Sequence, residues 1–120
     1  MVRLSGLHQQ RLLQLPRSFV VRRTSDAICR THQVRPRTVA EISAIETLLR
    51  SLALLKAAAL LPKVALRGTT GLKAIRLRGK SLRLEIGLLR LKDSSANSMV
   101  AAFTELAKAA VPEILSKQRS

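Results

Sequence analysis

Aromatic residues are nearly absent from this chain, which contains two Phe and neither Trp nor Tyr. Its core must therefore consist mainly of Leu, Ile, Val and Ala, which supply most of the 47% hydrophobic content. Sites for single-stranded nucleic acid usually stack bases on aromatic rings, so a site of that kind is not expected. The 120 residues are enough for about one small domain.

Cysteine and long apolar runs are also scarce. Cys29 is the only cysteine, which excludes an intramolecular disulfide and a zinc site of the cysteine-rich kind. The longest apolar stretch, residues 51–66, is interrupted by Lys56, Pro62 and Lys63. It falls short of the roughly 18–20 uninterrupted apolar residues that span a bilayer. No transmembrane segment is predicted, and the stretch is interpreted as a buried helix.

Acidic residues are few, because seven Asp and Glu stand against 22 Lys and Arg, for a formal net charge of +15. This imbalance favours an anionic partner such as RNA, DNA or an acidic membrane surface, and a merely soluble basic surface is the alternative. No pair of acids has the placement that a general acid and base require. His8 and His32 have no nearby cluster of carboxylates or thiols. We therefore predict no catalytic residue, no metal and no cofactor, and we do not expect an enzyme.

The N-terminal 40 residues differ from the rest in composition. They contain eight Arg, no Lys and a single acid, Asp26. Two interpretations stay open for residues 1–37: a disordered or irregular basic arm, and an Arg-rich, acid-poor targeting segment of the mitochondrial type. Either interpretation leaves residues 38–120 as a small folded domain.

A first helix is predicted at the start of that domain. Thr38 and Glu41 have the spacing of a capping box, in which each side chain accepts from a free backbone N–H of the other. Apolar residues then recur at spacings of three and four, which is the period of a helix. The helix is expected to end near Leu61, before Pro62.

A second helix is predicted after "KDSSAN", residues 92–97, with Asp93, Ser94 or Ser95 as its cap. Pro112 lies inside this helix and is expected to kink or break it near Ala110. Its apolar stripe is a candidate contact surface for a protein partner or a second copy of the chain, with ordinary core as the alternative. The stripe consists of Met99, Phe103, Leu106 and Ala110.

The stretch "AIRLRGKSLRLEI", residues 74–86, contains the last three letters of a phosphate-binding loop at Gly79, Lys80 and Ser81. Such a loop needs an earlier glycine, where Ala74 stands, and a helix after Ser81. Instead, apolar and charged residues alternate on both sides of Gly79 and Lys80, which predicts two strands joined by a type II′ turn. An antiparallel β-hairpin is therefore expected in place of a nucleotide site.

That hairpin register places Arg76 directly opposite Arg83 on one face. Like charges across a strand pair are destabilising, and a phosphate backbone between them would relieve the repulsion. A solvated basic face is the alternative. The candidate nucleic-acid-binding residues are Arg76, Arg78, Lys80 and Arg83.

These segments predict an α+β fold in the order helix, antiparallel β-hairpin, helix, with room for an edge strand before the first helix. Three of them resemble a known family: "AEISAIETLL", "LPKV" leading into "LRGKSLRLEI", and "SSANSMVAAFTELAKAAVPEIL". They are similar to the small dimer-forming subunit of the KEOPS complex, which supports threonylcarbamoyl modification of tRNA. The resemblance implies a non-catalytic scaffold that dimerises, docks a catalytic subunit and helps to hold tRNA.

The predicted function is therefore a non-enzymatic binding or scaffold subunit of an RNA-associated assembly, with tRNA as the candidate RNA. Its expected location is the cytoplasm or the nucleus. One alternative is a mitochondrially imported structural or ribosome-associated protein whose N-terminal presequence is removed. Another is a basic amphipathic protein that binds anionic membrane surfaces.

Overall fold

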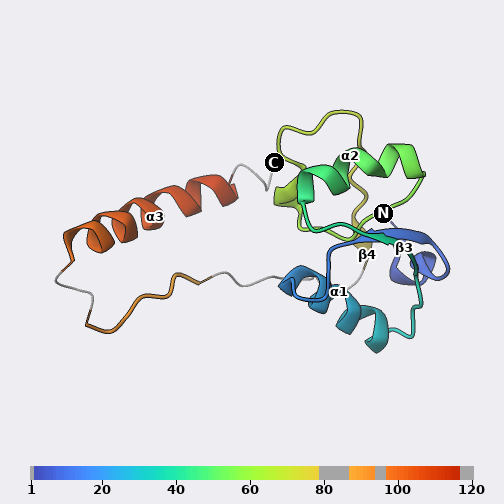
Figure 1. Ribbon diagram of the computed structural model, residues 1–120, viewed down its shortest axis with the longest axis horizontal. Helices are drawn as coiled ribbons and strands as arrows, with labels where there is room; N and C mark the ends of the chain where they lie inside the picture. Colours follow the sequence, from blue (N-terminus) through green and yellow to red (C-terminus); the bar gives the residue numbers. More distant parts are fainter. Residues whose placement is uncertain (1, 79–86, 94–96, 117–120) are drawn as a thin grey trace. The chain divides into compact units, whose positions relative to one another are not determined.

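The structure is a computed structural model that describes residues 2–78, 87–93 and 97–116. The chain divides into two compact units, Met1–Leu84 and Glu85–Ser120. The first unit contains β1 (Val2–Arg3), η1 (Leu4–Leu7), β2 (Arg11–Gln14), α1 (Val20–Thr31), β3 (Arg37–Glu41), α2 (Ile45–Leu55), η2 (Lys63–Leu66) and β4 (Leu77–Arg78). The second contains α3 (Ser98–Ser116). This mixture of helices and short parallel strand pairs confirms the predicted α+β class (Figure 1).

Strand β2 is the centre of the first unit because it is hydrogen-bonded along both edges. On one edge it pairs in parallel with β3, with a register shift between Leu12 and Leu13 that leaves Val39 without a partner. On the other edge, the Leu13 N–H donates to the Ala58 carbonyl at 2.9 Å, and the Ala58 N–H donates to the Arg11 carbonyl at 2.9 Å. With both edges paired, β2 is a central strand whose backbone donors and acceptors are satisfied within the protein.

The core forms around β2. Leu12, Leu13 and Leu48 are fully buried, and Leu15 is nearly so. Leu12 and Leu13 point to opposite faces of the strand because successive side chains alternate. Figure 1 shows α1 and α2 on opposite sides of β3, and both helices contribute to the core, since Leu48 of α2 belongs to it and Val21 of α1 packs against it. Burying one leucine side chain contributes about 1.5–3 kcal/mol, so these residues supply a large share of the unit's stability.

The irregular arm predicted for residues 1–37 is therefore wrong as a description of local structure. These residues contain β1, η1, β2 and α1 and contribute three of the core leucines. The four-residue strand "RLLQ" lacks polar alternation because it is buried on both faces, so it has no period-two pattern to reveal it. The division of the chain into residues 1–37 and 38–120 stays a prediction.

The first predicted helix is shorter than expected at both ends. Thr38 and Glu41 lie in β3 rather than in a capping box, and α2 begins at Ile45. Both side chains have long-range partners instead, since the Thr38 hydroxyl donates to Gln14 Oε1 and Glu41 binds Arg22. At its other end α2 stops at Leu55, so the interpretation of residues 51–66 as one buried helix is also wrong.

Lys56 ends α2 in the left-handed conformation, with φ of 47° and ψ of 51°. The Ala57 N–H then donates to the Leu52 carbonyl at 3.1 Å, the six-to-one bond of a Schellman motif. This turn reverses the chain and brings Ala58 beside β2.

Helix α3 matches the second predicted helix in the second unit, with a different cap. The Asn97 Oδ1 accepts from the backbone N–H groups of Met99 and Val100 at 3.0 and 3.4 Å, in place of the cap expected from Asp93, Ser94 or Ser95. The helix continues through Pro112 to Ser116, so the predicted break does not occur.

The predicted antiparallel hairpin falls largely outside the described residues, which omit 79–86. Its first half contains β4, and this strand pairs in parallel with β1, with Val2 opposite Leu77 and Arg3 opposite Arg78. A sequence pattern cannot reveal such a pairing, because the two strands are far apart along the chain.

Replacing Leu13 by Ala should lower the free energy of unfolding by about 2–5 kcal/mol, because a fully buried leucine loses its contacts and leaves a cavity. Denaturant unfolding followed by circular dichroism measures this loss. The matched control is Leu54→Ala on α2, whose residue is 84% exposed and whose removal should change stability little. Equal effects of the two substitutions would contradict the placement of β2 in the core.

Candidate functional site

The carboxyl ends of β2 and β3 lie side by side because the two strands are parallel. The Ile42 N–H donates to the Gln14 carbonyl at 2.9 Å and joins the two ends directly. Each strand leads through a short loop into a helix, β2 into α1 and β3 into α2. In open α/β sheets, ligands bind outside the carboxyl ends of adjacent parallel strands. The candidate site is therefore the surface formed by the carboxyl ends of β2 and β3, which we call the carboxyl edge.

Both helices begin here without a side-chain cap. Their N-cap residues are Phe19 and Ala44, and neither makes a side-chain hydrogen bond to its helix. Ser, Thr, Asp and Asn are the usual N-caps because they accept from the first free backbone N–H groups. The first-turn N–H groups of α1 and α2 therefore remain available to another acceptor, and the helix dipoles favour one with negative charge.

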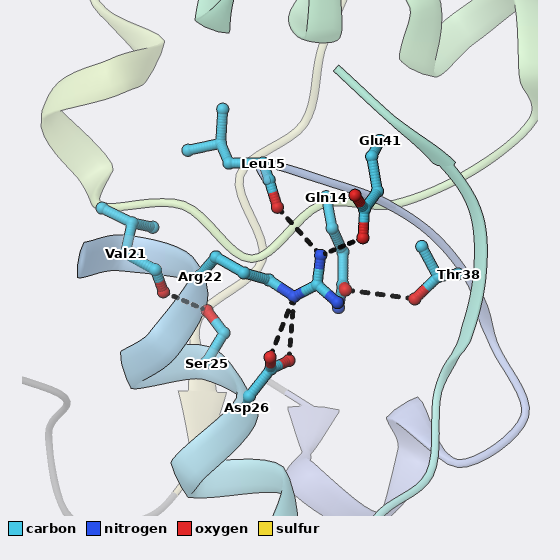
Figure 2. A network of polar contacts seen from close by, with 8 residues as sticks. All are labelled: Gln14, Leu15, Val21, Arg22, Ser25, Asp26, Thr38 and Glu41. Carbon is cyan, nitrogen blue, oxygen red and sulfur yellow. Dashed lines mark hydrogen bonds and ion pairs between the residues drawn. The ribbon is translucent and has the colours of Figure 1, made fainter. Parts of the chain in front are cut away.

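A buried arginine connects the two strand ends to α1 (Figure 2). Arg22 is 5% exposed, and its Nη1 donates to the Leu15 carbonyl at 2.9 Å and to Glu41 Oε1 at 2.8 Å. Its Nε donates to Asp26 Oδ1 and Oδ2, each at 3.0 Å. The guanidinium thus binds the end of β2, the end of β3 and the next turn of its own helix.

Opposing effects act on the pKa of Arg22. Burial lowers it, whereas hydrogen bonds from the guanidinium to Glu41 and Asp26, together with their negative charges, raise it above the ordinary value. The guanidinium is therefore permanently charged and balanced by two carboxylates. We interpret Arg22 as a positioning residue for this edge, since its donors are directed at protein groups.

The interior beside the network is closely packed. The cavity between Arg22, Leu13 and Leu61 has a volume of only about 10 Å³. That space is about the size of one water molecule, so a ligand at this edge has to bind on the loop surface. Two exposed hydroxyl side chains, Ser18 and Ser43, lie in the two loops.

The predicted arginine face is only partly described. Arg76 and Arg78 are exposed, and Arg78 lies opposite Arg3 of β1. Lys80 and Arg83 lie outside the described residues. Nucleic-acid binding by these four residues stays a prediction.

The predicted stripe on α3 is exposed. Met99 is 80%, Phe103 61% and Leu106 69% exposed, and Ala110 is also exposed. Met99 and Phe103 border a groove of about 410 Å³ together with residues 88–91, whereas Leu106 and Ala110 do not line it. The stripe as a partner-binding surface stays a prediction.

Within the described residues, no group of three His, Cys, Asp or Glu side chains could hold a metal ion. Cys29 is buried, and desolvation together with the charge of Asp26 raises the pKa of its thiol. A buried thiol with a raised pKa is a poor nucleophile, so Cys29 is assigned to packing. Among the residues that the structure describes, no helix is long and apolar enough to cross a membrane.

Comparison with known proteins identifies the family. The model of the LysR substrate binding domain matches residues 1–112, and the chain belongs to this family, which points to LysR-type transcriptional regulators. No solved structure matches the chain.

This finding corrects four predictions made from the sequence. The resemblance to the KEOPS subunit, the RNA-associated scaffold function, the tRNA partner and the mitochondrial alternative are wrong, because the matched family is one of transcriptional regulators. The resemblance depended on "AEISAIETLL" as one helix, yet Ala40 and Glu41 belong to β3. A family of regulators is compatible with the expectation that the chain is not an enzyme.

The sequence alone did not identify Arg22, because it lies in the segment interpreted as an arm. One local signal was present: Arg22 and Asp26 have the i,i+4 spacing of a helical ion pair. The contact with Glu41, 19 residues away, has no such local signature.

Replacing Arg22 by Met should lower the free energy of unfolding by about 1–3 kcal/mol, because the Leu15 carbonyl and two carboxylates lose their buried donor. Thermal and denaturant unfolding measure the change. Arg23→Met, an exposed neighbour on the same helix, is the control and should change stability by at most about 0.5 kcal/mol. If both variants unfold alike, Arg22 does not hold this edge together.

Proposed function

We propose that this chain is a ligand-recognition region of a LysR-type transcriptional regulator. A small polar ligand binds at the carboxyl ends of β2 and β3. The chain is a binding module and performs no chemistry on the ligand. Membership of the substrate-binding-domain family supports the ligand role, and the strand ends supply its location.

One observation supports this location above others. Two adjacent parallel strands end together, and each leads into a helix whose first N–H groups have no side-chain cap. In most helices a polar N-cap side chain occupies those donors. Both helix starts follow the same end of the strand pair, and their free backbone N–H groups are donors for carbonyl or carboxylate oxygens.

The donors that would contact the ligand are those without a partner in the described part of the protein. Arg22 is already bonded to Asp26, Glu41 and the Leu15 carbonyl, so it holds the loops in place. Recognition is left to the backbone N–H groups and to the hydroxyls of Ser18 and Ser43. This arrangement fits a compact ligand with oxygen acceptors.

Ligand contact with both loops would also stabilise their relative position. Arg22 joins the start of α1 to the end of β3, and the Ile42–Gln14 bond joins the two strand ends. A ligand shifts a conformational equilibrium only through different affinities for its states. Binding across both loops supplies such a difference, because a separation of the loops would remove half of the contacts.

The proposal keeps the cytoplasmic part of the predicted location, since LysR-type regulators are cytoplasmic proteins. The nuclear and mitochondrial alternatives have no support from the family match.

Small carboxylates such as acetate, succinate and benzoate, added to the isotopically labelled full chain, should shift amide resonances in residues 20–22 and 45–47, the first turns of α1 and α2. The reason is that these backbone N–H groups are the proposed donors. A bound carboxylate should also raise the melting temperature, by an amount that grows with its concentration.

Bulky substitutions provide the matched test. Ser18→Trp and Ser43→Trp should abolish the resonance shifts, because each covers one loop of the edge. Thr70→Trp, in the exposed turn of residues 67–71, should leave them intact. Shifts that persist in both loop variants, or that cluster around residues 67–71, would place the ligand elsewhere.

A further inference from the structure

The amino ends of β2 and β3 form a second edge with a different electrostatic character. Arg11 and Arg37 are direct register partners across the parallel pair, and both are exposed. Arg35, also exposed, precedes β3 by two residues. Parallel strands lie about 4.8 Å apart, so Arg11 and Arg37 begin at closely spaced backbone positions.

Backbone hydrogen bonds fix the segments that contain these arginines. The Arg37 N–H donates to the Gln10 carbonyl at 2.8 Å, and the Gln9 N–H donates to the Arg35 carbonyl at 2.9 Å. The Arg35 N–H donates to His8 Nδ1 at 3.2 Å. The three arginines are therefore held on one ordered edge, which we call the arginine edge.

Negative charge close to the arginine edge is scarce. The first unit contains only three acids, Asp26, Glu41 and Glu46, and two of them bind Arg22 at the opposite ends of the strands. None of the ion pairs found among the described residues includes Arg11, Arg35 or Arg37. Adjacent like charges destabilise a strand pair, so an anion bound between them would relieve the repulsion.

The chemistry of the arginine edge selects among anionic partners. A guanidinium presents a planar fork of donors that matches two oxygens of a phosphate. No large exposed apolar side chain belongs to residues 8–11 or 35–37, which is unlike a surface that inserts into lipid. The same residues include no Phe, Tyr or Trp on which unpaired bases could stack, and the one ring present, the His8 imidazole, accepts from the Arg35 N–H.

We propose that the arginine edge, Arg11, Arg35 and Arg37, binds the phosphate backbone of double-helical DNA. The contact is independent of base sequence, since phosphate contacts position a protein without reading bases. The duplex is taken to be DNA because the chain belongs to a family that points to transcriptional regulators, which act on DNA. This site goes beyond the proposed ligand function and lies at the other ends of the same two strands.

Fluorescence anisotropy with the full chain and a labelled random-sequence DNA duplex tests the proposal across a series of NaCl concentrations. The triple variant Arg11→Gln, Arg35→Gln and Arg37→Gln should make the slope of log affinity against log salt shallower by about 2.7, because each phosphate contact contributes about 0.9. When the salt concentration rises from about 50 to 200 mM, the affinity of both proteins falls. The factor by which it falls should be about 40 times smaller for the variant than for the unmodified chain.

The matched control removes the same charge elsewhere, through Arg50→Gln, Arg67→Gln and Lys73→Gln, all at exposed positions. The slope should change much less in this control. An equal change in both triple variants would overturn the proposal, because net charge alone would then explain binding. The conservative triple variant Arg11→Lys, Arg35→Lys and Arg37→Lys should retain the salt slope, which separates loss of charge from loss of fold.

Two further measurements complete the test. Vesicles of anionic phospholipid should bind the unmodified chain and the triple variant alike, and a loss confined to vesicles would assign the arginine edge to membranes and overturn the proposal. The triple variant should keep the carboxylate-induced amide shifts, because those arise at the opposite strand ends. The two sites are measured separately, so a loss of DNA binding confined to the triple variant of the arginine edge would support that site even if carboxylates shift no amide resonance of the unmodified chain.

Discussion

Parallel pairing of β2 with β3 is the constraint on which the rest of the first unit depends. In a parallel pair both carboxyl ends lie at one edge and both amino ends at the other. Both strands therefore lead into a helix at their carboxyl ends, whereas Arg11 and Arg37 lie opposite each other at their amino ends. A hairpin would have mixed the two kinds of end, so a single choice of strand direction separates two surfaces of different chemistry.

The arginines at the two ends of the strand pair differ in burial. Arg22 is removed from water, where an unpaired charge is strongly unfavourable, and two carboxylates and a carbonyl satisfy it. The arginines at the strand starts keep their charge in water, where mutual repulsion is weakened by solvent and salt. Burial therefore makes Arg22 a structural element, whereas exposure leaves the other arginines available for contact with an anion.

Elements that depend on a local pattern of apolar residues could be predicted from the sequence. Elements whose structure depends on residues far away along the chain could not. Helix α3 and the middle of α2 have apolar residues at helical spacing, and both form helices. Thr38 and Glu41 match a capping box, but their partners are Gln14 and Arg22, which lie far away along the chain. The candidate site was not predicted at all, because parallel pairing has no local pattern and uncapped helix ends are recognised only once the helix starts are known.

The register shift between Leu12 and Leu13 has a consequence for the outer side of β3. Among the described residues β3 is paired only with β2, so its other side is an open sheet edge, which is a template for strands of other molecules. The shift interrupts the regular hydrogen-bond spacing of the strand, and Arg37 and Glu41 place a charge at each end. The irregularity that leaves Val39 without a partner is thus of the kind that makes an open sheet edge a poor template for further strands.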